Sequence, residues 1–237
     1  MIKMKYKRVL IKISGEALAG ESGHGIDFEK AIGVCEKIKT CLDQGVQIAI
    51  VVGAGNFWRG RNGNNMDHTR ADHMGMLATM MNCLALQDTF IKIGVDARVL
   101  AAIDMQQFAE PYIRDKAVNH LEAGRVVIFG CGTGNPFVTT DTAAAMRAVE
   151  ISADIALLAK NVNGVYDKDP KTHPDAKRFE KITYMDVLTK ELSVIDTTAT
   201  ALCKDNDMPV LLFELGNGDN IVRAIQGEHI GTVITKN

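Results

Sequence analysis

Apolar residues along the chain fall into short continuous runs that are separated by longer amphipathic stretches. The runs at 8–14, 46–52 and 125–130 are apolar at nearly every position instead of at alternate ones, which is typical of strands covered on both faces. The stretches between the runs carry apolar residues at helical spacing. In 28–45 that spacing predicts one buried face, ending before Gly45, that consists of Phe28, Ala31, Ile32, Cys35, Ile38 and Leu42.

The same patterns continue to the end of the chain. A helix is expected to end near Gly124. Strands are predicted at 8–14, 46–52, 96–102, 125–130, 153–160, 209–215 and 231–235, and helices at 28–45, 72–93, 142–151, 184–192, 197–206 and 218–227.

Strands and helices therefore alternate almost throughout, with no linker, repeat or low-complexity tract between them. This alternation predicts an α/β protein: a three-layer α/β/α sandwich with a mostly parallel central sheet, formed by a single domain over residues 1–237. Ligands of such sheets bind at the carboxyl ends of the strands, so the loops that follow the strands hold the functional information.

Composition narrows the class of partner. The 237 residues are 46% hydrophobic and 24% charged, with a net charge of −2, which gives no electrostatic reason to expect nucleic acid or a membrane as partner. The basic start at 1–8 is not followed by the apolar segment of a signal peptide, because Lys12 interrupts it. The five cysteines include no Cys-x-x-Cys pair, so we expect free thiols and a cytoplasmic protein.

The first strand ends in a segment with phosphate-binding chemistry. Lys12 lies within the strand, and Ser14 and Gly15 follow at its end. A cation, a hydroxyl and exposed backbone N–H groups at one point favour a phosphate. A lysine that reaches solvent from an edge strand gives the same pattern, and this loop alone does not distinguish the two interpretations.

The second strand ends in GAGNFWRG, residues 53–60. Trp58 stands where a dinucleotide fingerprint needs its third glycine, and no Gly-Lys-Ser/Thr follows. A glycine-rich turn with Arg59 close behind remains. It predicts either a second phosphate contact, because the guanidinium matches phosphate oxygens, or a tight turn with a surface arginine.

The fourth strand is followed by GCGTGNPFVTTD, residues 130–141. Its glycines allow a ligand to approach the backbone, and Thr139 and Thr140 offer hydroxyls at the start of a helix, where anions are favoured. A helix N-cap at Thr140 or Asp141 explains one of these residues but not the segment before it.

A fourth loop, 159–170, follows the next strand and contains two acids. It lacks the glycine of a calcium-binding loop, and no tightly bound metal is expected anywhere in the chain. Four glycine-rich loops at one sheet edge, two with cations and two with acids, together predict a site for two phosphate-bearing ligands and phosphoryl transfer between them.

The helix predicted at 72–93 is apolar on nearly every side. It is interpreted as a core helix or, slightly favoured, as a helix that packs against another subunit. Asp72 begins this helix, where an acid can cap the backbone.

At this point the motifs identify a family. KISGEAL, GAGNFWRG, DHMGMLATMMN, GCGTGNPFVTTDTAA and KNVNGVYDKDP, in this order along essentially the whole chain, resemble the bacterial uridylate kinases of the amino-acid-kinase family. The resemblance implies an α/β/α sandwich, a homohexamer, and transfer of the γ-phosphoryl group of Mg-ATP to UMP, which gives UDP and ADP for pyrimidine nucleotide biosynthesis. Mg²⁺ is expected to arrive with ATP.

The resemblance also assigns residues. It implies ATP contacts at Lys12, Ile13, Ser14, Gly15, Gly55, Arg59, Lys160, Asn161, Tyr166 and Asp169. It implies UMP contacts at Ala54, Asp72, Thr133, Gly134, Asn135, Pro136, Phe137, Val138, Thr139 and Thr140, with Asp72 on the ribose. It also implies a catalytic group of Lys12, Arg59, Asp141 and Asp196, in which the two acids hold the lysine or the metal.

The resemblance also extends to regulation. The segment formed by Gly20, Glu21, Ser22, Gly23, His24 and Gly25 matches the part of the family tied to activation by GTP. Inhibition by UTP is also expected. Two residues depart from the family: Ala54 replaces a common glycine, and Asn163 stands where many members have aspartate.

Two alternative functions stay open: an amino-acid or carbamate kinase of the same family, and a non-catalytic protein that stores a nucleotide or oxyanion. TGNPFVTTD, at 133–141, favours the uridylate branch.

Overall fold

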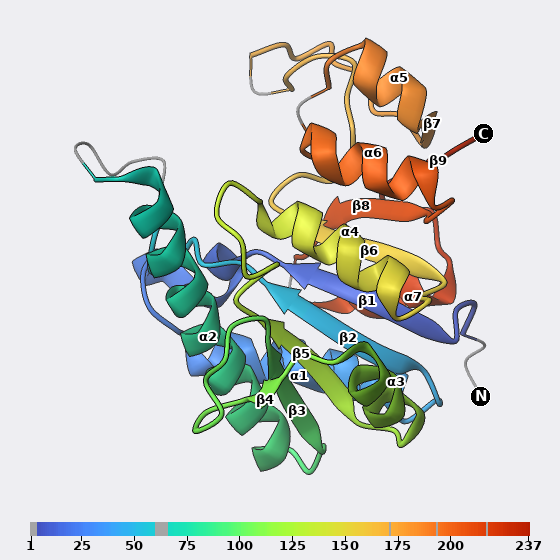
Figure 1. The fold of residues 1–237 in the computed structure, drawn as a ribbon. Helices are drawn as coiled ribbons and strands as arrows, with labels where there is room; N and C mark the ends of the chain where they lie inside the picture. The colour runs from blue at the N-terminus through green and yellow to red at the C-terminus, as the bar shows by residue number, and fades with distance from the viewer. Residues whose placement is uncertain (1–3, 60–65, 171, 193, 217) are drawn as a thin grey trace.

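A computed structural model describes residues 4–59, 66–170, 172–192, 194–216 and 218–237. Within these residues nine strands form one sheet, in the order β4-β3-β5-β2-β1-β6-β8-β9-β7 (Figure 1). Neighbouring strands are parallel except β8 and β9, which are antiparallel. The strands are β1 Arg8–Ile13, β2 Gln47–Val52, β3 Ala97–Ala101, β4 Glu110–Pro111, β5 Val126–Gly130, β6 Ile155–Lys160, β7 Lys181–Thr183, β8 Val210–Glu214 and β9 Thr232–Thr235.

Helices cover both faces of the sheet. One layer contains α1 Phe28–Leu42, α2 His68–Lys92 and α7 Asp219–Gln226; the other contains α3 Arg114–Glu122, α4 Thr140–Glu150 and α6 Thr197–Asp205, with α5 Tyr184–Thr189 against α6. In Figure 1, α4 lies across the front of the sheet and α1 lies behind it. The predicted α/β/α sandwich with a mostly parallel sheet is confirmed.

Alternation along β1 divides its side chains between the two layers. Val9, Ile11 and Ile13 join the core formed with α1, α2 and α7. Leu10 joins the core formed with α3, α4 and α6. Lys12, two residues after Leu10, therefore faces the layer of α4. Because β1 is the central strand of the sheet, the interpretation of Lys12 as an edge-strand lysine is wrong.

Polar side chains set where several helices begin. Asp27, Asp67, Thr139, Thr183 and Asp196 each accept a backbone N–H from the first turn of the helix that follows. A cap of this kind stabilises a helix by roughly 1 kcal/mol, because it satisfies a donor that has no partner within the helix.

The first residues of two helices, α2 and α4, differ from prediction by two residues or more. The structure begins α2 at His68 with Asp67 as its cap, so Asp72 lies inside the helix and does not cap it. The cap of α4 is Thr139, one residue before Thr140.

The buried face of α1 also differs from prediction. Phe28 is 50% exposed and Ile32 37% exposed. The face that meets the core consists of Ala31, Val34, Cys35, Ile38 and Cys41.

Two short strands, β4 and β7, were not predicted. Each lies at an outer edge of the sheet, where few residues pair and the apolar pattern is too short to detect. Across the described ranges, no helix combines the length and the apolar character needed to cross a bilayer.

Candidate active site

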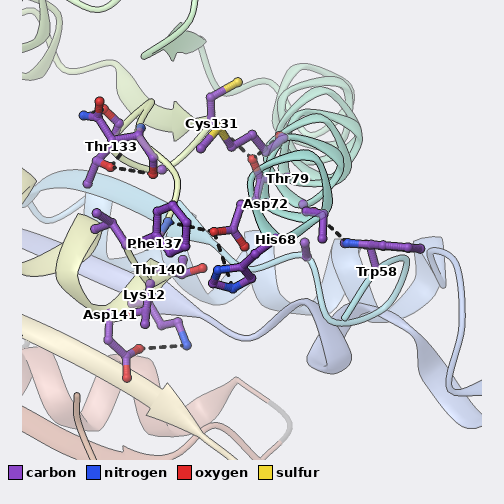
Figure 2. A pocket seen from close by; sticks show the side chains of 18 residues that line it. Lys12, Trp58, His68, Asp72, Thr79, Cys131, Thr133, Phe137, Thr140 and Asp141 are labelled. Atoms are coloured by element: carbon purple, nitrogen blue, oxygen red, sulfur yellow. Dashed lines mark hydrogen bonds and ion pairs between the residues drawn. The ribbon is translucent and has the colours of Figure 1, made fainter. Parts of the chain in front are cut away.

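A cavity of about 500 Å³ lies at the carboxyl ends of the central strands. Its walls come from β1, the loop after β2, the first half of α2, the loop after β5 and the start of α4, as Figure 2 shows. The residues that line it are Lys12, Ala54, Trp58, His68, Ala71, Asp72, Gly75, Met76, Thr79, Cys131, Gly132, Thr133, Asn135, Phe137, Val138, Thr139, Thr140 and Asp141.

Most of the predicted UMP contacts meet in this cavity. Of the ten, Gly134 and Pro136 are not among its lining residues. Of the predicted ATP contacts, Lys12 is the one that lines it. The cavity thus brings together the predicted acceptor residues and the predicted catalytic lysine.

The loop after β5 has an unusual backbone. Cys131, Gly132, Gly134 and Phe137 have φ between 57° and 82°. This is a left-handed backbone conformation that residues other than glycine rarely adopt. At Gly134 a β-carbon would also lie 3.0 Å from the carbonyl oxygen of Ala102. Glycine is therefore required there by both conformation and space.

Asp72 closes one side of the cavity. Its Oδ2 accepts the backbone N–H of Phe137 at 2.7 Å and lies 3.9 Å from Nε2 of His68. The His68 ring packs edge-on against the exposed Phe137 ring, with centroids 4.5 Å apart (Figure 2). Asp72 therefore connects α2 to the loop after β5, and its carboxylate faces the cavity.

Lys12 and Asp141 form the charged centre of the site. Lys12 Nζ lies 3.1 Å from Asp141 Oδ1, and Lys160 Nζ lies 2.6 Å from Asp141 Oδ2. Burial alone would raise the pKa of the Asp141 carboxyl, but the two ammonium groups outweigh it and hold that pKa below its ordinary value. Asp141 is therefore a carboxylate that organises two lysines from neighbouring strands.

Asp196 lies between α4 and α6. Its Oδ1 accepts from Thr142 Oγ1 and from the backbone N–H of Ala199, both at 2.8 Å, and its Oδ2 accepts from Thr139 Oγ1. Asp196 thus caps α6 and holds the two threonines at the start of α4. In this structure it positions the helix end that faces the cavity.

The predicted donor-side residues are spread over other cavities. Lys160 and Asn161 line a cavity of about 1150 Å³ together with Glu21 and Ser22 of the predicted effector segment. Tyr166 and Asp169 line one of about 470 Å³. Part of segment 20–25 therefore lines the same cavity as two predicted ATP residues.

A further cavity of about 710 Å³ shares lining residues with the cavities on both sides of the site. It is lined by Asp141, Lys160 and Asp196. Gly60, the last residue of the second motif, lies outside the described residues.

Glu16 organises this donor side, and the sequence interpretation missed it. Its carboxylate accepts from Arg59 Nη2 and from Asn161 Nδ2 at 2.9 Å. It joins residues that follow three different strands. The signal was a lone acid directly after Ser14 and Gly15, in a segment interpreted as phosphate binding.

Three further lining residues were missed or judged structural. His68, whose ring packs against Phe137, had no role in the sequence interpretation. Trp58 Nε1 donates to the carbonyl of Ala71 at 2.8 Å and so anchors the loop after β2 on α2. Thr79 Oγ1 accepts the N–H of Cys131 at 3.0 Å. A buried hydroxyl inside the apolar run of α2 was the available signal.

In the part of the chain that is described, no group of three or more His, Cys, Asp and Glu side chains is placed to hold a metal ion. Asp141 Oδ1 is a buried oxygen that could contact a metal ion. It has no hydrogen bond of regular geometry to any described residue, although Lys12 Nζ is 3.1 Å away. One buried carboxylate fits an ion that phosphates largely coordinate.

Comparison with known proteins agrees with this architecture. A parallel sheet whose central strand presents a lysine to an aspartate at a helix start, among glycine-rich loops, defines a phosphoryl-transfer class. The model of the amino acid kinase family matches residues 7–214, and the chain belongs to that family. The predicted family is thereby confirmed.

Solved structures specify the branch. The chain is similar to the UMP kinase from Bacillus anthracis, with 38% identity, 98% of this chain and 97% of that chain covered, and a TM-score of 0.94. It is equally similar to the UMP kinase from Ureaplasma parvum, with 38% identity, 98% and 100% coverage and a TM-score of 0.93. The uridylate kinase from Archaeoglobus fulgidus is more distant, with 28% identity, 96% and 99% coverage and a TM-score of 0.74.

Proposed function

We propose that this protein is an ATP-dependent UMP kinase, which transfers the γ-phosphoryl group of ATP to UMP and releases UDP and ADP. The observation that supports it best is the cavity of about 500 Å³ in which the loop after β5, Asp72 and the Lys12–Asp141 pair meet. Similarity to two UMP kinases over nearly the whole chain supports the same activity.

UMP occupies this cavity in the proposal. Thr139 and Thr140, at the N-terminus of α4, receive its phosphate, because unpaired N–H groups and the helix dipole favour an anion there. Asp72 accepts hydrogen bonds from the ribose hydroxyls, and Phe137 lies beside it as an apolar wall.

Lys12 is the proposed catalytic residue. The acceptor is a phosphate oxygen of UMP that is already ionised, so the in-line displacement needs no general base. The negative charge on the transferring group is the main obstacle, and a preorganised ammonium beside it lowers the barrier. Asp141 holds Lys12 in place and remains ionised, because its pKa is lowered.

ATP occupies the donor side in the proposal. Lys12 to Gly15, Gly55 and Arg59 face its phosphates, while Lys160, Asn161, Tyr166 and Asp169 surround the nucleoside. Glu16 supports this arrangement because it binds both Arg59 and Asn161.

Mg²⁺ accompanies ATP in this proposal, and Asp141 would hold it, since its Oδ1 is a buried oxygen of the kind that Mg²⁺ prefers. When bound, the ion supplies positive charge to the phosphates.

The test is an assay of purified protein with Mg-ATP and, separately, UMP, CMP, aspartate, glutamate and carbamate, with ADP formation as the readout. We expect ADP with UMP well above every other acceptor. ADP formed mainly with an amino acid or carbamate would assign the chain to another branch of the family. Tight nucleotide binding with no ADP from any acceptor would indicate a storage protein.

Oligomerisation belongs to the same proposal. Met74, Leu77, Met81, Leu84 and Ile91 form an exposed apolar face of α2, 37–58% exposed, opposite the face that contacts the sheet. We place another copy of the chain on this face in a homohexamer, as the family resemblance implies. Light scattering of the purified protein gives the mass directly, and a monomer would contradict the assembly.

Effector nucleotides are the last part of the proposal. GTP activates and UTP inhibits in this scheme, with GTP acting through segment 20–25, whose Glu21 and Ser22 border the cavity of Asn161. Titration of GTP and of UTP at fixed ATP and UMP tests it, and unchanged rates would contradict it. We place the enzyme in the cytoplasm, which suits five free and buried cysteines.

A further inference from the structure

Two asparagines that have so far been given no role are buried together beside the active site. Asn56 follows β2 and is 1% exposed; Asn82 lies in α2 and is 0% exposed. Their side-chain amides bind each other reciprocally, with both N–O distances 2.8 Å.

Each amide donates its second N–H to a backbone carbonyl of a loop. Asn82 Nδ2 donates to the carbonyl of Gly53 at 2.8 Å, and Asn56 Nδ2 donates to the carbonyl of Gly25 at 2.7 Å. The Gly25 N–H in turn donates to the carbonyl of Asn56 at 3.0 Å. All four N–H bonds of the amide pair are therefore satisfied, and both polar backbone groups of Gly25 bind Asn56.

The first strand's loop approaches the same point. A β-carbon on Gly15 would lie 2.5 Å from Asn56 Oδ1, 2.6 Å from the carbonyl oxygen of Gly53 and 2.9 Å from the N atom of Gly55. Gly15 thus packs directly on the loop that the amide pair holds. Segments 12–15 and 20–25 thus meet segment 53–59, which is distant in the sequence, at one buried hydrogen-bonded unit.

We propose that the Asn56–Asn82 pair is a positioning unit that holds loop 53–59 and Gly15 in their active geometry and joins segment 20–25 to them. The kinetic part of this inference rests on the proposed function. The physical reason is that a buried polar network is rigid while every member is paired, and loses that rigidity when one member is removed.

The tryptophan of the chain makes the loop observable. Trp58 is the only tryptophan, it lies in loop 53–59, and its Nε1 is hydrogen-bonded to Ala71. Its accessibility to acrylamide therefore reports the order of the loop without any assay of activity.

The test compares Asn82→Leu with Gln87→Leu. Gln87 is on the same helix, and its amide also donates to a backbone carbonyl, that of Ala97 at 3.0 Å in β3, so it loses an equivalent bond away from the loop. We expect Asn82→Leu to raise acrylamide quenching of Trp58 about twofold and to lower kcat/KM at least tenfold, mainly through kcat, with Gln87→Leu near wild type in both. Equal quenching and equal kinetics in the two variants would overturn the proposal.

Hydrogen exchange of the wild-type protein gives a second test that does not depend on a variant folding. The Gly25 and Trp58 amides, both hydrogen-bonded at this unit or its loop, should show protection factors within about threefold of each other, because they open together. A Gly25 amide that exchanges more than tenfold faster than Trp58 would refute the coupling. A wild-type protein that does not phosphorylate UMP would refute the proposed function, while quenching and exchange would still decide the positioning role.

Discussion

The acceptor side and the donor side of this active site are built differently. The predicted acceptor residues come largely from one loop, 131–140, and most of them line a single cavity. The predicted donor residues lie in or after three strands, β1, β2 and β6, and the structure divides Lys12, Asn161 and Tyr166 among three cavities. One side is thus contained in a continuous segment, and the other is assembled across the sheet.

The two sides also differ in what stabilises them. The acceptor loop depends on backbone conformation, with positive φ at four positions. The donor side depends on charge, because Glu16 pairs with Arg59 and Asp141 pairs with Lys12 and Lys160. Substitutions in the acceptor loop should therefore act through geometry, and those on the donor side through charge and pH.

The largest expected effect is on the stability of the charged centre. Asp141→Asn leaves two lysines without their carboxylate and should destabilise the fold by about 3 kcal/mol near neutral pH. Because the folded pKa of Asp141 is lowered, its contribution is present above the unfolded pKa of about 4 and is lost as pH falls through the folded pKa. Denaturant unfolding of both proteins at pH 7 and pH 3 checks this, and a difference in unfolding free energy that is the same at both pH values would contradict it.

Lys12→Ala tests the donor side kinetically. Loss of one preorganised electrostatic stabiliser should lower kcat by at least ~100-fold. Lys160→Ala is the matched control, since it also removes a partner of Asp141 but is not among the residues lining the acceptor cavity. It should raise KM for ATP with a much smaller loss of kcat. A folded Lys12→Ala protein with near-normal kcat would remove Lys12 from the mechanism.

Gly134→Ala tests the acceptor side through its backbone. Residue 134 has a φ of 82°, and a β-carbon there would lie 3.0 Å from the Ala102 carbonyl oxygen, so alanine would be both strained and crowded. We therefore expect the free energy of unfolding to fall by about 2–3 kcal/mol and KM for UMP to rise. Gly23 has a similar φ of 67°, but a β-carbon there would meet open space. Gly23→Ala should therefore lower the free energy of unfolding by only about 1 kcal/mol. Equal losses of unfolding free energy would show that crowding at Gly134 has no effect.

The smallest effect concerns Asp72, which tests the identity of the acceptor. Asp72→Asn keeps an acceptor for the Phe137 N–H but loses the charge offered to the ribose. We expect KM for UMP to rise several-fold, about 1 kcal/mol, with KM for ATP unchanged and the preference for UMP over dUMP narrowed. Because Asp67 caps the helix, the melting temperature should hardly change. Measurement of kcat/KM for UMP and dUMP decides it, and an unchanged ratio with unchanged KM would exclude the ribose role.

Much of the fold follows from the chain alone. Continuous apolar runs locate β1, β2, β5 and β6, because a strand covered on both faces has few polar positions. The loop proposed to hold the acceptor also stands out in the sequence, since glycines and threonines between a strand and a helix have few structural explanations. The start of α2 was placed too late, because the cap residue Asp67 precedes the apolar pattern.

What the sequence determined, then, is local: the alternation of elements, the motifs at strand ends and the family that they indicate. What tertiary structure decided is which of those motifs touch. The strand order places β1 between β2 and β6, which sets Glu16 beside Asn161, and the packing of α4 on β1 sets Lys12 beside Asp141. It also buries Asn56 against Asn82. Such contacts join residues far apart in the chain, and neither spacing nor periodicity encodes them, because they arise when separate strands align at one edge of the sheet.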